Sequence, residues 1–73
     1  MDIQKRIDEA FLAPTQGQIY RLIIDDTEKI LIQKALERTS GNQIFAARIL
    51  GVNRNTLRSK IKKLNIDLAR FKE

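Results

Sequence analysis

A chain of 73 residues with 32% charged and 42% hydrophobic residues has the composition of one small globular domain. The absence of cysteine and histidine excludes disulfides and removes the side chains that most zinc and haem sites require, together with the commonest general base. We therefore expect no catalytic residue, no metal site and no cofactor. No stretch approaches the roughly 20 apolar residues of a membrane span, so no membrane partner is expected either.

The net charge of +5 is unevenly distributed along the chain. Residues 1–41 carry six basic and seven acidic side chains, which leaves that half close to neutral. Residues 42–73 carry eight basic side chains and only two acidic ones. This segregation is typical of a scaffold followed by a surface that binds a polyanion, and the alternative is a solvated basic helix.

Two helices are expected in the first half of the chain. Apolar residues at helical spacing predict the first over about residues 2–12, and Pro14 breaks it. A long helix is expected over about residues 18–39, and Gly41 follows it in the left-handed conformation that ends many helices. The β-branched run 19–24 is also compatible with a strand, but the chain offers no partner strand, which favours the helix.

The apolar residues of these two helices form a face wider than one short domain can bury. A small chain without disulfides or metal is commonly stabilised by oligomerisation. We therefore expect residues 1–40 to form a helical dimerisation region, covered in part by a second copy of the chain. The residues expected at this homodimer interface are Ile3, Ile7, Phe11, Ile19, Tyr20, Ile23, Ile24, Ile30 and Leu31.

Two shorter helices are expected within residues 41–66. Asn42 is suited to cap a helix over about residues 42–50, and Asn53 is suited to cap another over about residues 54–64. Two short helices joined by a tight turn, the second basic on its outer face, indicate a helix-turn-helix. In that motif the second helix, the recognition helix, enters the major groove of DNA.

The spacing of small and apolar residues supports this motif. Ala47 is small where the two helices cross, and Gly51 allows the positive φ of the turn. One position departs from the pattern, because Lys60 stands where an apolar residue is usual and Ile61 follows it. A slightly different angle of the recognition helix is one explanation. The fold class is then all-α, a four-helix domain with a C-terminal helix-turn-helix, and residues 67–73 are expected to fray.

The run GNQIFAARILGVNRNTLRSKIKKLNI, residues 41–66, strongly resembles the C-terminal signature of the Fis family. The same domain ends the NtrC-type activators of the alternative sigma factor, and residues 19–40 resemble the long second helix of the family. The resemblance implies an intertwined homodimer whose two recognition helices enter successive major grooves of an inverted-repeat site, with bending of the DNA. It also implies further N-terminal domains in a longer parent chain.

The resemblance also implies which residues contact DNA. Ile44 and Ser59 depart from Fis, where a phosphate-contacting Thr and a Lys stand, so neither is expected as a contact. The residues that match family positions at the DNA surface or near phosphates are Asn42, Asn53, Arg54, Thr56, Arg58, Lys60, Lys62 and Lys63, and Asn55 joins them on the outer face of the recognition helix.

Individual roles follow from the chemistry of these side chains. Arg58, one turn into the recognition helix, can donate two parallel hydrogen bonds to guanine, and a phosphate contact is its alternative. Arg54 has the same two options. Asn53 can cap the helix, contact DNA or do both, and the lysines are expected to position the domain on phosphates rather than to read sequence.

The leading hypothesis is a sequence-specific, dimeric DNA-binding domain of a bacterial transcription regulator of NtrC type, located in the cytoplasm at the nucleoid. One alternative is a Fis-like nucleoid protein that bends DNA with loose specificity. Another is a helical module whose basic face binds an acidic protein. The acidic cluster Asp25, Asp26 and Glu28 is interpreted as a solvated helix face rather than as a metal site.

Overall fold

The computed structural model describes residues 2–13 and 17–72, and over this range it is all-α without strands. The helices are α1 (Ile3–Leu12), α2 (Ile19–Arg38), α3 (Gln43–Leu50), α4 (Arg54–Lys63) and a short 3-10 helix, η1 (Leu68–Phe71). The four expected helices are confirmed, and where their ends differ from expectation they differ by one residue. The expected break at Pro14 lies outside the described residues.

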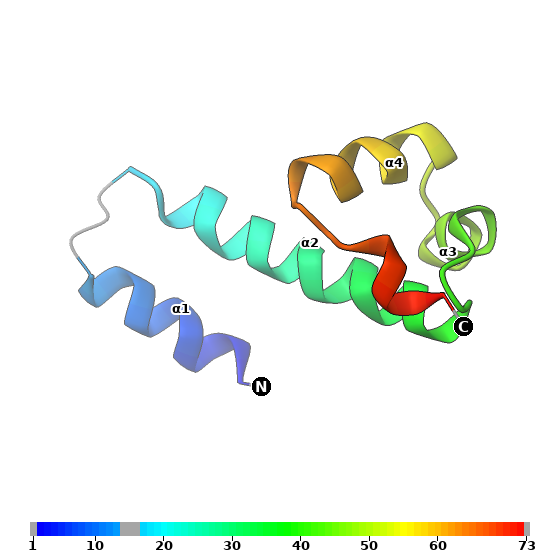
Figure 1. Cartoon of the computed structure of the whole chain (residues 1–73). Coiled ribbons are helices and arrows are strands. Elements are labelled where there is room, and N and C mark those ends of the chain that lie inside the picture. The colour runs from blue at the N-terminus through cyan, green and yellow to red at the C-terminus, as the bar shows by residue number, and fades with distance from the viewer. Residues whose placement is uncertain (1, 14–16, 73) are drawn as a thin grey trace.

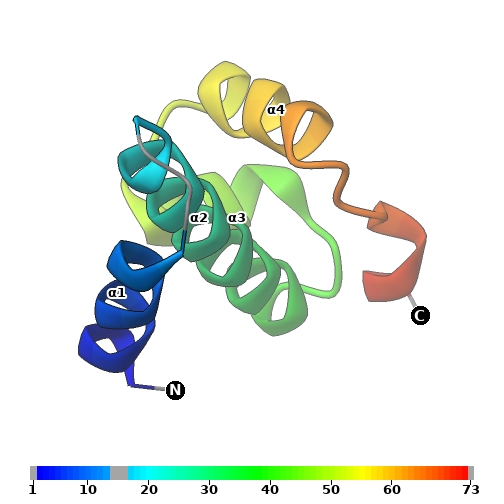
Figure 2. The same ribbon diagram turned by 90° about the vertical axis from the view of Figure 1, so that its left-hand side faces the viewer.

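The long helix α2 forms the centre of the arrangement (Figure 1). α1 folds back along one side of α2, whereas α4 lies on the other side, as both views show (Figures 1 and 2). An ion pair between Arg6 and Asp26 joins α1 to α2, and Asp2 caps α1 by accepting hydrogen bonds from the N–H groups of Gln4 and Lys5 at 3.0 and 3.3 Å. In the described residues, no helix is both long and apolar enough to cross a bilayer.

The principal core lies where the C-terminal half of α2 meets α3 and α4. Leu36 of α2 and Leu57 of α4 are the largest fully buried side chains. Ala46 of α3 belongs to the same core and is 0% exposed. Alanine at that place allows the helices to approach closely, since a larger side chain would overpack the contact. The other buried members of this core are Ile32, Ala35, Ala47, Ile61 and Ile66.

The C-terminal segment packs on the domain, so the expectation of a frayed tail is wrong over residues 67–72. Leu68 and Phe71 of η1 are partly buried against the core, and Asp67 caps η1 by accepting a hydrogen bond from the N–H of Ala69 at 3.0 Å. Gly41, with φ +82°, lies under this segment, since a Cβ there would meet Lys72 Cγ at 3.3 Å. The apolar area of η1 holds the tail in place. Glu73 lies outside the described residues.

Phe71→Ala should therefore destabilise the protein. We expect a loss of about 1–2 kcal/mol in the free energy of unfolding, less than for a fully buried phenylalanine because Phe71 is only partly buried. Urea unfolding followed by circular dichroism measures it. The control is Lys72→Ala, an exposed neighbour expected to change stability by less than about 0.5 kcal/mol. Equal and negligible effects of both substitutions would mean that the tail does not contribute to the core.

Candidate nucleic-acid interface

The turn between α3 and α4 fixes the relative placement of the two helices. Gly51 adopts φ +75°, and the N–H groups of Gly51 and Val52 donate to the carbonyls of Arg48 and Ala47 at 3.2 and 3.0 Å. These bonds satisfy the last carbonyls of α3. The chain then turns over three residues, 51–53, before α4 begins. The left-handed glycine and the buried small residue at position 47 are as the sequence predicts.

Both helices of the motif begin with an asparagine cap. The Oδ1 of Asn42 accepts a hydrogen bond from the N–H of Phe45 at 3.1 Å, and the Oδ1 of Asn53 accepts one from the N–H of Asn55 at 2.8 Å. Each cap uses the amide oxygen, so the two donors of the side-chain NH₂ remain available. Both asparagines are exposed, which allows one side chain to cap a helix and donate to an anion.

Three basic side chains form a line along α4, which we call the basic ridge: Arg54, Arg58 and Lys62. They are spaced by four residues, which places them on one side of a helix, and all three are exposed. Within residues 2–13 and 17–72 none of the three forms an ion pair. The basic ridge therefore carries three charges that no described acidic side chain neutralises.

Polar residues extend this surface on both sides of the basic ridge. Asn55 and Ser59 line a shallow depression with Arg58 and Lys62 on the outer face of α4. The same two basic residues line a second depression together with Gln43 at the start of α3. Thr56 is exposed in the first turn of α4. Gln43 was not predicted from the sequence, because it follows the capping Asn42 and lies beside the basic ridge through the turn between α3 and α4.

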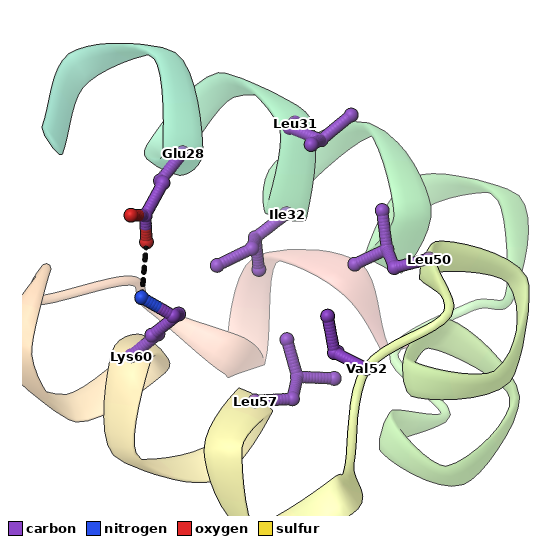
Figure 3. A pocket seen from close by; sticks show the side chains of 7 residues that line it. All are labelled: Glu28, Leu31, Ile32, Leu50, Val52, Leu57 and Lys60. Carbon is purple, nitrogen blue, oxygen red and sulfur yellow. Dashed lines mark ion pairs between the residues drawn. The ribbon is translucent and has the colours of Figure 1, made fainter. Parts of the chain in front are cut away.

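The other two predicted lysines of α4 are directed elsewhere. Lys60 Nζ lies 2.7 Å from Glu28 Oε2 of α2, and Lys63 Nζ lies 3.7 Å from Asp25 Oδ1 of the same helix (Figure 3 shows the first pair). The structure therefore does not bring Lys60 or Lys63 together with the basic ridge. Opposite charges in α2 hold them on the side of α4 that faces the scaffold.

These pairs also correct the interpretation of the acidic cluster in α2. Asp25, Asp26 and Glu28 are not a solvated face, because each is only partly exposed and each pairs with a basic side chain of another helix. The sequence signal was the lysine at position 60, where an apolar residue is usual, but it was interpreted only as a different angle of the recognition helix. Among the described residues, no group of acidic side chains could hold a metal ion.

The residues expected at a dimer interface differ in their accessibility within one chain. Ile23 is buried, so it is not part of the surface open to a second copy, and Ile7 and Ile19 are half-buried. The remaining six, which are 37–81% exposed, are Ile3, Phe11, Tyr20, Ile24, Ile30 and Leu31.

Comparison with known proteins agrees with this geometry. Residues 23–64, more than half of the chain, match the family described as bacterial regulatory protein, Fis family. The chain belongs to the Fis family. Its helix-turn-helix is thus that of a DNA-binding, non-enzymatic family, and membership implies DNA binding in transcription regulation.

The chain is also similar to the DNA-binding transcriptional regulator NtrC of Azospirillum brasilense. The two are 39% identical over 72 residues, which cover 93% of this chain and 15% of that protein. The chain thus spans only a small part of this relative. No solved structure shows a significant match.

The cap of the Fis-family recognition helix can be tested by substituting Asn53. Asn53→Ala removes the acceptor for the N–H of Asn55 and should lower the free energy of unfolding by about 1 kcal/mol. Asn53→Ser retains a capping oxygen, so it should lower the free energy of unfolding by only about 0.3 kcal/mol. Urea unfolding of both variants measures the difference, and equal losses would contradict the capping role. If Asn53→Ser then binds DNA more weakly, the amide group also contacts DNA.

Proposed function

We propose that this chain is the DNA-binding domain of a bacterial transcription regulator of NtrC type, and that it binds double-stranded DNA as a homodimer with α4 in the major groove. The observation that carries the proposal is the basic ridge, whose three charges lack described acidic partners and lie on the second helix of a helix-turn-helix. Family membership and the similarity to NtrC support it. The domain would act in the cytoplasm at the nucleoid, without a cofactor.

The residues of the interface divide by chemistry into readers and anchors. Arg58 lies one turn into α4, where its planar guanidinium can donate two parallel hydrogen bonds to O6 and N7 of guanine, worth about 1–3 kcal/mol of discrimination. Lys62 offers a point charge to phosphate, and the exposed N-terminus of α3, capped by Asn42, offers donors to the DNA backbone. We therefore assign the reading of base sequence to Arg58, with Arg54 as a second candidate. Lys62 and the N-terminus of α3 would position the domain on the DNA backbone.

Two observations support the homodimer. The radius of gyration is 13.8 Å, compared with about 11 Å for a compact domain of this length, which indicates that a single chain is more extended than a self-sufficient core requires. Large apolar side chains of the first two helices are also exposed, including Tyr20 at 81% and Phe11 at 68%. A second copy that covers them would complete a core and present a second recognition helix.

Dimerisation would also determine the form of the DNA site. Two recognition helices related by a two-fold axis read an inverted repeat, with half-sites separated by about 34–36 Å or one turn of the double helix. A shorter separation between the helices would require the DNA to bend, at a cost of a few kcal/mol that makes the flanking sequence matter. A straight site in a circular-permutation gel shift would contradict bending.

Arg58→Ala should weaken binding to DNA. We expect affinity for a duplex selected from a random pool by the wild-type protein to fall by at least about thirtyfold, because the dimer would lose two bidentate contacts, one per half-site, at about 1–3 kcal/mol each. Fluorescence anisotropy at several salt concentrations measures the affinity and its salt dependence. The matched control is Lys34→Ala, which removes the same charge from an exposed side chain on α2.

Equal affinities of the wild type and Arg58→Ala would overturn the groove-reading role. An acidic protein partner would then be the better hypothesis. If the wild-type protein instead binds the selected duplex no better than the random pool, the domain is an architectural DNA-bending protein and not a sequence-specific regulator.

Tyr20→Asp should dissociate the dimer. A carboxylate cannot be buried without a partner, so we expect dimerisation to weaken by about 30-fold or more. The folded monomer should be little affected, because Tyr20 is exposed and an acidic residue is favourable in the first turn of a helix. Sedimentation equilibrium measures the dissociation constant. Ile49→Asp, at a 57% exposed site on α3, is the control, and an equal effect of both would contradict the proposed interface.

A further inference from the structure

The environment of Lys60 combines an apolar groove with a single carboxylate. The groove has a volume of about 140 Å³, and Figure 3 shows that its side chains come from α2, the end of α3, the turn and α4. Glu28 stands at its edge and forms the 2.7 Å ion pair with the Lys60 ammonium group. The residues that line the groove are Glu28, Leu31, Ile32, Leu50, Val52, Leu57 and Lys60.

This environment accounts for a lysine at a position that is usually apolar in a helix-turn-helix. The methylene groups of Lys60 can cover the groove while the ammonium group reaches Glu28, since long basic side chains commonly place an apolar stem on apolar surface and a charged end beyond it. The two paired side chains are only 36% and 30% exposed. A partly buried, short pair of this kind holds its geometry better than an exposed one.

Lys60 is also on the wrong side of α4 for the basic ridge. Successive residues of an α-helix are rotated by about 100°, so Lys60 is about 200° around the axis from Arg58 and nearly opposite to it. Lys62, four residues after Arg58, is rotated from it by only about 40°. A DNA duplex that contacts the basic ridge is therefore on the far side of α4 from the Lys60–Glu28 pair.

We infer that Lys60 is a positioning residue, which acts through Glu28 to hold the recognition helix at a fixed angle to α2, and that it is not a phosphate ligand. The inference rests on the proposed binding of DNA by α4. Because α2 belongs to the dimerisation region, this pair couples the orientation of each recognition helix to the dimer. The Lys63–Asp25 pair at 3.7 Å is on the same helix pair, but its lysine is 65% exposed and it constrains α4 less.

A positioning residue and a phosphate ligand have different effects on binding. A phosphate ligand contributes equally to every DNA sequence, and its loss reduces the slope of log affinity against log salt by about 0.9 for each lysine removed. Loss of a positioning residue leaves non-specific attraction intact, but it misaligns the side chains that read bases. The predicted consequence is a loss of selectivity without a change in the salt slope.

The test compares Lys60→Met with Lys62→Met in the same anisotropy titration, with a duplex selected by the wild-type protein and with the random pool. Methionine retains an unbranched apolar stem in the groove. For Lys60→Met we expect about two- to fivefold weaker binding to the selected duplex, the usual range for one such ion pair, with unchanged affinity for the pool and an unchanged salt slope. For Lys62→Met we expect both duplexes to weaken and the slope to fall.

The reversed pair, Glu28→Lys with Lys60→Glu, provides a rescue that a phosphate ligand would not show. Under the positioning role it restores selectivity and the wild-type salt slope, whereas Lys60→Glu alone lowers selectivity because two carboxylates then face each other. Under the phosphate role the reversed pair keeps the reduced slope, because residue 28 is on α2. Restoration supports the inference and a persistent loss overturns it.

Glu28→Gln gives an independent result if Lys60→Met does not fold. The positioning role predicts lower selectivity at an unchanged slope. Higher affinity with a steeper slope would mean that Glu28 withholds Lys60 from phosphate, and it would overturn the inference.

The same titrations separate failure of the inference from failure of the proposed function. If Arg58→Ala and Lys62→Met leave DNA binding unchanged, the proposed function itself fails. If those two weaken binding and Lys60→Met reduces the salt slope as Lys62→Met does, only the positioning role fails.

Discussion

The close contact of α3 with the C-terminal half of α2 is the constraint on which the rest of the structure depends. Ala46 is completely buried there, and Leu36 of α2 and Leu57 of α4 are buried in the same core. Close approach of α3 determines where the turn at Gly51 delivers the chain, and burial of Leu57 then determines the rotation of α4 about its axis. The side of α4 opposite to Leu57 must face solvent, and the basic ridge flanks that side. The interface is thus a consequence of core packing rather than of any interaction among the basic residues themselves.

α2 connects the surface proposed for dimerisation with the core beneath the helix-turn-helix. Its C-terminal half contributes Ile32, Ala35 and Leu36 to the core beneath the helix-turn-helix, whereas its N-terminal half packs with α1 and leaves Tyr20 exposed. A rigid helix of 20 residues is about 30 Å long, so a second copy docked at its N-terminal end would have a defined position relative to α4, which lies alongside α2 and pairs with it at Asp25 and Glu28. Between α4 and α2, the ion pairs of Lys60 with Glu28 and of Lys63 with Asp25 add to the contacts of Leu57 and Ile61 in the core, and under the inference drawn above they would help to fix the orientation of α4.

The sequence predicted the local features well because their causes are local. Apolar periodicity predicted the four helices, and the asparagine caps and the glycine turn depend on residues within a few positions of one another. It did not predict the packing of η1, since Phe71 lies beside Gly41 and against the core, and Gly41 is 30 positions earlier in the chain. Nor could it pair Lys60 with Glu28, because these residues are 32 positions apart and their contact depends on the angle between α2 and α4. Assignment by resemblance treated every lysine of the recognition helix alike, whereas the structure separates them by direction.

This separation changes how the charge of the chain should be interpreted. The second half carries eight basic side chains, but α2 neutralises two of those in α4, and the basic ridge comprises only three. Non-specific attraction to DNA grows with the number of charges that reach phosphates, and it favours all sequences equally. A regulator that must find one site among many benefits when non-specific attraction to DNA is limited. Under the proposed function, Arg58 must at the same time stay aligned with a base. Under the proposed function, pairing lysines with the acidic residues of α2 would do both, because it would remove charge from the DNA-binding surface and use it to hold the recognition helix in place.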